Sequence, residues 1–185
     1  MSVKRFLILF LSLLIVACGG EVLPKPKAML RLEYPEASFE NFSSNCGYSF
    51  DKNTIAQVVA KNDCSFDLNY KKMKASIFLT YKPVNDNLNE LLRDAQKLTY
   101  EHVVRADNID SKMFVNDEDK VYGMFYKVTG NAASSRQFYA TDSIHHFLTG
   151  SLYFYAKPNY DSIVPAADYL EKDIKRIMES LKWTD

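Results

Sequence analysis

The most constraining feature of the sequence is a short apolar run, residues 6–16, that ends in the lipobox Ile15-Val16-Ala17-Cys18. Two basic residues precede this run, which gives it the layout of a secretory signal. A spanning helix needs about 20 apolar residues, so the run is too short to cross a bilayer. We therefore predict that residues 1–17 are a lipoprotein signal peptide and that Cys18 carries the lipid. An ordinary cleaved signal peptide or a membrane anchor is the alternative.

The charge balance argues against binding to nucleic acid. The whole chain has 23 basic and 23 acidic side chains, and two of the basic ones lie in the predicted signal. The remaining domain is thus slightly acidic and lacks the basic excess typical of nucleic-acid-binding proteins. No basic stretch next to Cys18 could hold the protein to anionic lipid. The acyl chains must then supply membrane binding, and the predicted partner is membrane lipid.

Two cysteines, Cys46 and Cys64, remain once Cys18 is acylated. An even pair in an exported protein indicates a disulfide bond. Two free buried thiols are the alternative. Neither cysteine has a second ligand at the spacing of a zinc site, so we predict no metal.

The chain divides into a tether and one folded domain. Residues 18–38 are rich in glycine and proline and show no apolar periodicity, which predicts a flexible, partly extended tether. A first edge strand through residues 30–32 is the alternative for its second half. Residues 39–185 have a length suited to a single globular domain with its own core.

The domain alternates strand-forming and helix-forming segments. Short strands are predicted at residues 48–50, 55–60, 64–70 and 75–81. A capping box at Asn87 and Glu90 then opens an amphipathic helix. Its predicted buried stripe is Leu88, Leu91, Leu92, Ala95, Leu98, His102, Val103 and Ala106.

A second set of strands and a second helix follow. Strands are predicted at residues 113–115, 121–129, 135–141 and 145–156, and a helix from about Ser162 to Trp183. Strands joined by tight turns must be antiparallel. We therefore predict an α+β fold, an antiparallel β-sheet sandwich with two amphipathic helices packed on it.

One group of residues could be read as catalytic. Asp142, Ser143, His145 and His146 are close in sequence, so a Ser-His-Asp set is conceivable. However, neighbouring strand residues point to opposite faces, and no nucleophile-elbow sequence is present. We favour a turn followed by an ordinary strand, with no catalytic residues. His102 is interpreted as a packing residue of the helix.

Two features could form a partner-docking surface. The small residues Gly130, Asn131, Ala132, Ala133 and Ser134 would allow another backbone to approach closely, although a tight turn explains the Gly-Asn pair. The last long strand is aromatic on both faces and ends in Tyr153 and Tyr155. We expect a helix to cover each face. A face left uncovered would be suited to binding protein.

Several segments together resemble the gliding motility lipoprotein GldD family. They are Asn87–Leu92, Val121–Tyr126, Gly130–Ser135, Gln137-Phe138, Thr141–Ser143, His146–Leu148, Leu152–Phe154, Asp161–Ile163, Lys172–Ile174 and Trp183. The signal, the tether and the Cys46/Cys64 pair also fit. The strand and helix order is similar to PsbP-like sandwiches as well, which is an analogy of fold alone.

The resemblance implies a membrane-anchored accessory component of the gliding and type IX secretion machinery. It implies other envelope proteins as partners, and no enzymatic activity or cofactor. Gly19 after Cys18, in place of aspartate, favours the outer membrane by sorting analogy, and the lack of an acidic run after Cys18 favours the side facing the periplasm. The alternative is an envelope small-ligand-binding protein or hydrolase with a site near Asp142, Ser143, His145 and His146.

Overall fold

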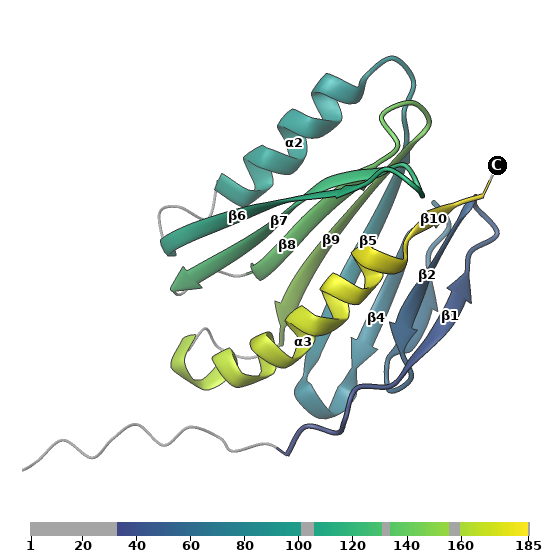
Figure 1. Cartoon of the computed structure of the whole chain (residues 1–185). Coiled ribbons are helices and arrows are strands. Elements are labelled where there is room, and N and C mark those ends of the chain that lie inside the picture. The colour runs from purple at the N-terminus through teal and green to yellow at the C-terminus, as the bar shows by residue number, and fades with distance from the viewer. Residues whose placement is uncertain (1–32, 101–105, 131–133, 156–159, 185) are drawn as a thin grey trace, which may run out of the picture.

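The computed structural model describes residues 33–100, 106–130, 134–155 and 160–184, and Figure 1 shows how they are arranged. The large sheet has the spatial order β3 (Gln57–Ala60), β4 (Phe66–Tyr70), β5 (Ala75–Pro83), β9 (His146–Phe154), β8 (Ser134–Thr141), β7 (Val121–Gly130) and β6 (Ala106–Asn116). The small sheet has the order β1 (Phe39–Ser43), β2 (Tyr48–Asn53) and β10 (Lys182–Trp183). Two α-helices, α2 (Leu88–Tyr100) and α3 (Tyr160–Ser180), and the 3-10 turn η1 (Lys71–Met73) complete the described elements.

All strand pairs in the two sheets are antiparallel, which confirms the predicted α+β fold. The central pair, β5 and β9, is in register over nine residues, from Ala75 opposite Phe154 to Pro83 opposite His146. Alternation along β9 explains the layers. One face carries Leu148 and Leu152, which belong to the main core, whereas the opposite face carries Phe147, which belongs to a second cluster.

The two helices lie on opposite sides of the large sheet (Figure 1). Helix α3 and the small sheet cover the face with the main core, to which α3 contributes Leu170, Ile174 and Ile177. Helix α2 contributes Leu91 and Ala95 to a smaller cluster on the other face. Among the described residues, no helix combines the length and apolarity needed to span a membrane.

The first helix is shorter than predicted. Helix α2 ends at Tyr100, and Ala106 begins the long strand β6 instead of continuing the helix. Leu98 is exposed, and the buried residue of the last turn is Thr99, whose hydroxyl bonds to Gln137 on β8 at 3.1 Å. The apolar stripe was therefore extended one turn too far. His102 and Val103 lie outside the described residues.

Several strand ends also differ from the prediction. Cys64 has a left-handed φ of 62° and precedes β4, and the exposed Ile55 precedes β3. His145 lies in the turn before β9. Trp183 does not end the helix but pairs with Tyr48 of β2 as part of β10.

Candidate functional site

The Asp142 turn is built by its own carboxylate. Oδ1 of Asp142 accepts hydrogen bonds from the backbone N–H groups of Ile144, His145 and His146, at 2.8–3.0 Å. Burial raises the pKa of Asp142, but these three bonds outweigh it and lower the pKa below its ordinary value. Ser143 has a left-handed φ of 70°, as such a turn requires. Asp142 therefore acts as a turn-forming acceptor in this structure.

The two histidines have different surroundings. His146 is buried, stacks on Trp183 with ring centroids 4.9 Å apart, and its Nδ1 lies 2.9 Å from the Tyr81 hydroxyl. His145 is exposed, and its Nδ1 lies 3.7 Å from Asp142. The sequence candidates are thus close together, but the structure places no Ser143 hydrogen bond to either ring among the described contacts. Their geometry is that of a turn with an aromatic anchor.

The disulfide between Cys46 and Cys64 is present, with the two Cα atoms 5.8 Å apart. It links the turn before β2 to the turn before β4. The Tyr48 hydroxyl donates a hydrogen bond of 2.6 Å to the Cys64 carbonyl oxygen, and the Tyr48 ring stacks on Tyr81. The disulfide therefore fixes the end of the molecule that also holds His146.

The residues proposed for partner docking fall into two groups. Gly130 and Ser134 are buried, and residues 131–133 lie outside the described residues. Tyr153 and Tyr155 are exposed and contact each other edge to face, with centroids 5.3 Å apart. The expected coverage of both β9 faces by helices was therefore wrong at this end, because Tyr153 and Tyr155 stay exposed on the face that α2 packs against.

An ionic cluster that the sequence analysis missed joins β8 to α3. Arg136 is 1% exposed, and its guanidinium donates to Glu171 at 2.7 Å and to Asp168 at 2.6 Å. Lys127 and Lys175 complete the cluster around Glu171. Burial raises the pKa of Glu171, but bonds from Lys175, Arg136 and Lys127 lower it to about 2.

A second buried polar cluster lies between β2 and α3. Both carboxylate oxygens of Asp173 accept from the Asn53 amide at 3.1 Å. Burial raises the pKa of Asp173, even though the bond from Asn53 opposes this shift. The buried Tyr70 hydroxyl does not meet the geometry of a hydrogen bond to any described residue. Burial and the nearby charge of Asp173 both raise the pKa of Tyr70. A carboxylate among the apolar positions of α3 was the sequence signal for this cluster.

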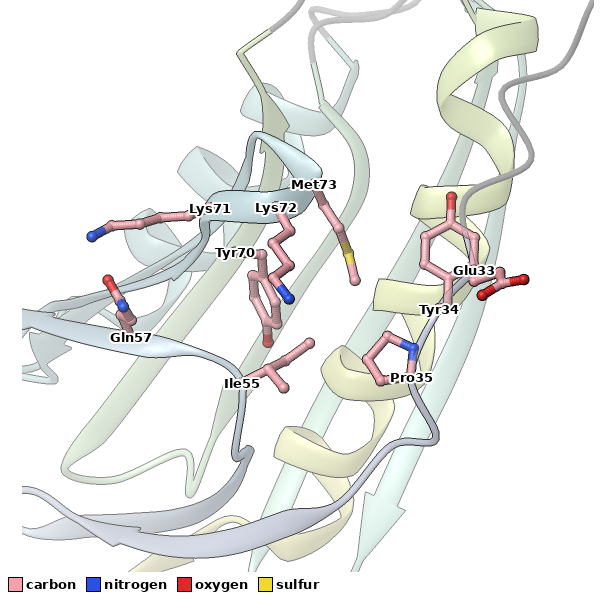
Figure 2. Close-up of a pocket in the computed structure, with 9 residues that line it drawn as sticks. All are labelled: Glu33, Tyr34, Pro35, Ile55, Gln57, Tyr70, Lys71, Lys72 and Met73. Carbon is pink, nitrogen blue, oxygen red and sulfur yellow. The ribbon is translucent and has the colours of Figure 1, made fainter.

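A cavity of about 760 Å³ lies beside Tyr70. Figure 2 shows Tyr34 and Pro35 on one side of it and Ile55, Tyr70 and Met73 on the other. Tyr34 belongs to the segment predicted as tether, and it stacks on Tyr169 of α3 with centroids 5.0 Å apart. We call this space the junction cavity, because its walls come from that segment and from the β3–β4 and η1 region.

The described residues contain no group of His, Cys, Asp and Glu side chains placed to bind a metal ion. The family model described as gliding motility lipoprotein GldD matches residues 19–183, which is nearly the whole chain. No curated protein matches the sequence. The chain therefore belongs to the gliding motility lipoprotein GldD family.

Proposed function

We propose that this protein is a lipid-anchored, non-enzymatic accessory component of the gliding and type IX secretion machinery. The family match over residues 19–183 is the observation that carries the proposal. In this proposal residues 1–17 are removed, Cys18 carries the acyl chains, and residues 18–38 tether the domain of residues 39–185. The protein is anchored in the outer membrane, faces the periplasm, and binds other envelope proteins without a cofactor.

The geometry of the Asp142 turn supports a non-enzymatic role. Oδ1 of Asp142 accepts hydrogen bonds from three backbone N–H groups, and Nδ1 of His146 lies 2.9 Å from the Tyr81 hydroxyl. A catalytic base has to be within hydrogen-bond reach of the nucleophile that it activates. These side chains instead stabilise the turn and anchor the C-terminal strand through Trp183.

Anchoring is tested by the Cys18→Ser variant, with Gly20→Ala as the matched control. The serine hydroxyl cannot replace the thiol that receives the lipid, so the variant should leave the membrane fraction and the cells should lose gliding. The control should keep both. Membrane retention of Cys18→Ser would contradict lipidation, and gliding with a soluble protein would contradict the need for the anchor.

The hydrolase alternative is tested by two variants that spare the structural side chains. Ser143→Gly removes the hydroxyl and suits the left-handed φ of 70°. His145→Gln removes an exposed imidazole. Gliding at unchanged protein level should be normal for both variants. Loss of gliding in either one would favour a catalytic role.

The junction cavity favours small-ligand binding as the second candidate function. Its volume of about 760 Å³ falls within the range of small-molecule sites. Ile55→Trp would fill part of it, whereas Val59→Trp places the same side chain on an exposed position of β3 outside the lining. Both variants should glide normally under the accessory role. Loss of gliding with Ile55→Trp alone would support ligand binding.

A further inference from the structure

Strand β6 forms one edge of the large sheet and is unusually open. It is eleven residues long, and among the described residues it pairs with β7 on one side only. None of its residues is buried, and its apolar side chains include Met113, 70% exposed, and Val115, 52% exposed. The opposite edge strand, β3, has only four residues. The open hydrogen-bonding edge of the sheet is therefore concentrated at β6.

The usual protections of an edge strand are weak here. Proteins shield such edges with short strands, charged side chains, proline, bulges or a covering element. The charges of β6 are of both signs, Asp107, Asp110 and Lys112, so they do not repel every incoming strand. β6 contains no proline, and its single register shift lies at its start, between Ala106 and Asn108. From Asn108 to Asn116 the strand is regular. This stretch presents unpaired backbone groups over a length that another strand could match.

We propose that β6 pairs antiparallel with β6 of a second copy of this chain, around a two-fold axis at Ser111. In this register Asp110 of each copy lies opposite Lys112 of the other, which forms two opposite-charge pairs. Ile109 of each copy lies opposite Met113 of the other, which forms two apolar pairs. Directly opposed side chains of these kinds stabilise antiparallel strands. The strand is thus complementary to itself.

The sheet register places each pair on a single face. Ile109 and Met113 pair with Val128 and Met124 of β7, so both point to the α2 side. Asp110 and Lys112 lie at the alternate positions and point to the α3 side. Pairing across the axis therefore brings apolar side chains together on one face and opposite charges together on the other.

Neighbouring registers are less favourable. An axis at Asp110 would place the two Asp110 carboxylates opposite each other, and an axis at Lys112 would do the same with the two ammonium groups. Like charges directly opposite destabilise a strand pair. An axis between two residues would oppose side chains that point to different faces. Charge complementarity therefore favours an axis at Ser111 over an axis at either neighbouring residue.

Cysteine cross-linking in the full-length protein in its own membrane tests this register. At the axis the two Ser111 Cα atoms would be about 4.5–5.5 Å apart, within the range of a disulfide. Ser111→Cys should give a band at twice the monomer mass on non-reducing gels after mild oxidation. Met113→Cys is the matched control, because its copies would be about 13 Å apart along the strand. The control should remain monomeric.

Charge reversal in the Ser111→Cys background tests the pairing chemistry. Asp110→Lys alone would oppose two ammonium groups twice, and Lys112→Asp alone would oppose two carboxylates twice. Each should reduce the cross-linked fraction by roughly tenfold. The double reversal restores opposite charges and should restore cross-linking. If Asp110 and Lys112 were only solvated surface residues, the double reversal would not restore cross-linking.

Three results would overturn the proposal. One is no dimer from Ser111→Cys while the Cys46–Cys64 disulfide shows that the domain is folded. Another is equal cross-linking of Met113→Cys, which would indicate unspecific collision. The third is a mixed disulfide with a different protein, which would assign the edge to another chain. None of these results would bear on the accessory function proposed above, which is tested by gliding.

Discussion

Replacement of Arg136 by methionine tests the ionic cluster that joins β8 to α3. The Arg136 guanidinium is buried and donates to Glu171, to Asp168 and, at 2.9 Å, to the carbonyl oxygen of Ser135. Methionine fills a similar volume without the charge or the hydrogen-bond donors. The variant therefore isolates the polar contribution of the side chain from its packing.

The contacts that remain in the variant should make its loss of stability smaller than is usual for a broken buried ion pair. Breaking a buried ion pair by removing one partner typically costs about 3–5 kcal/mol. Here Glu171 would keep Lys175 at 2.6 Å and Lys127 at 3.3 Å. Asp168 is half exposed and would be hydrated. We therefore expect Arg136→Met to lower the free energy of unfolding by about 2–3 kcal/mol, which lowers Tm by about 5–10 °C.

Thermal and urea unfolding followed by circular dichroism would measure this loss. Lys127→Met is the matched control, because Lys127 contacts the same two carboxylates but is 36% exposed. An exposed pair of this kind contributes at most about 1 kcal/mol. An equal loss in the free energy of unfolding for Arg136→Met and Lys127→Met would refute this reasoning. It would show that burial does not strengthen the ion pairs of Arg136.

Acid unfolding gives an independent measurement of the same cluster. The pKa of Glu171 is lowered from 4.5 to about 2 in the folded protein, so its contribution is present above 4.5 and is lost as pH falls toward 2. Arg136→Met removes one cause of the lowered pKa. The variant should therefore lose less additional stability than the parent protein over this pH interval.

Three further variants follow from buried contacts. Asp173→Asn should raise the free energy of unfolding by about 1 kcal/mol at neutral pH, because burial disfavours the ionised carboxylate and raises the pKa of Asp173. This gain should fade below pH 3.8, where the parent carboxyl is protonated. A gain that persisted in acid would contradict this cause. Gly123→Ala should cost about 3 kcal/mol or prevent folding, since its Cβ would lie 2.1 Å from the Tyr139 carbonyl oxygen; unchanged urea unfolding would be inconsistent with that contact. Serine at both Cys46 and Cys64 should cost about 3 kcal/mol for a loop of 18 residues, and reduction of the parent protein should reproduce the loss.

The local pattern of the sequence was sufficient for most of the fold. Strands β7, β8 and β9 follow from alternating apolar residues between turn-forming segments, and helix α3 follows from its stripe of buried positions. The predicted positions Leu170, Ile174 and Ile177 are fully buried in the main core. These features depend on the spacing of residues that are close in sequence, so they can be predicted from one sequence.

The side-chain clusters depend on contacts between distant segments. Arg136 meets Glu171 across 35 residues, and Asn53 meets Asp173 across 120. Nothing near Arg136 in the sequence indicates that an arginine in this strand is buried, because its partners come from the helix that packs on it. The Asp142 turn shows the opposite case. Its serine, histidines and carboxylate are close in sequence, but the bonds to the backbone determine where they point.

The size of the large sheet explains why one of its faces stays partly open. Seven strands at about 4.8 Å spacing span about 29 Å, whereas one helix is about 10 Å wide and covers two or three strands. Helix α3 has the small sheet beside it on the same face, but α2 is the only described element that packs on the other. Tyr153, Tyr155 and Met113 are therefore exposed on the α2 side because of strand number, whatever their hydrophobicity. Docking of a partner on the tyrosines remains a prediction, and it now has a physical basis in an apolar face that the chain's own helix is too small to cover.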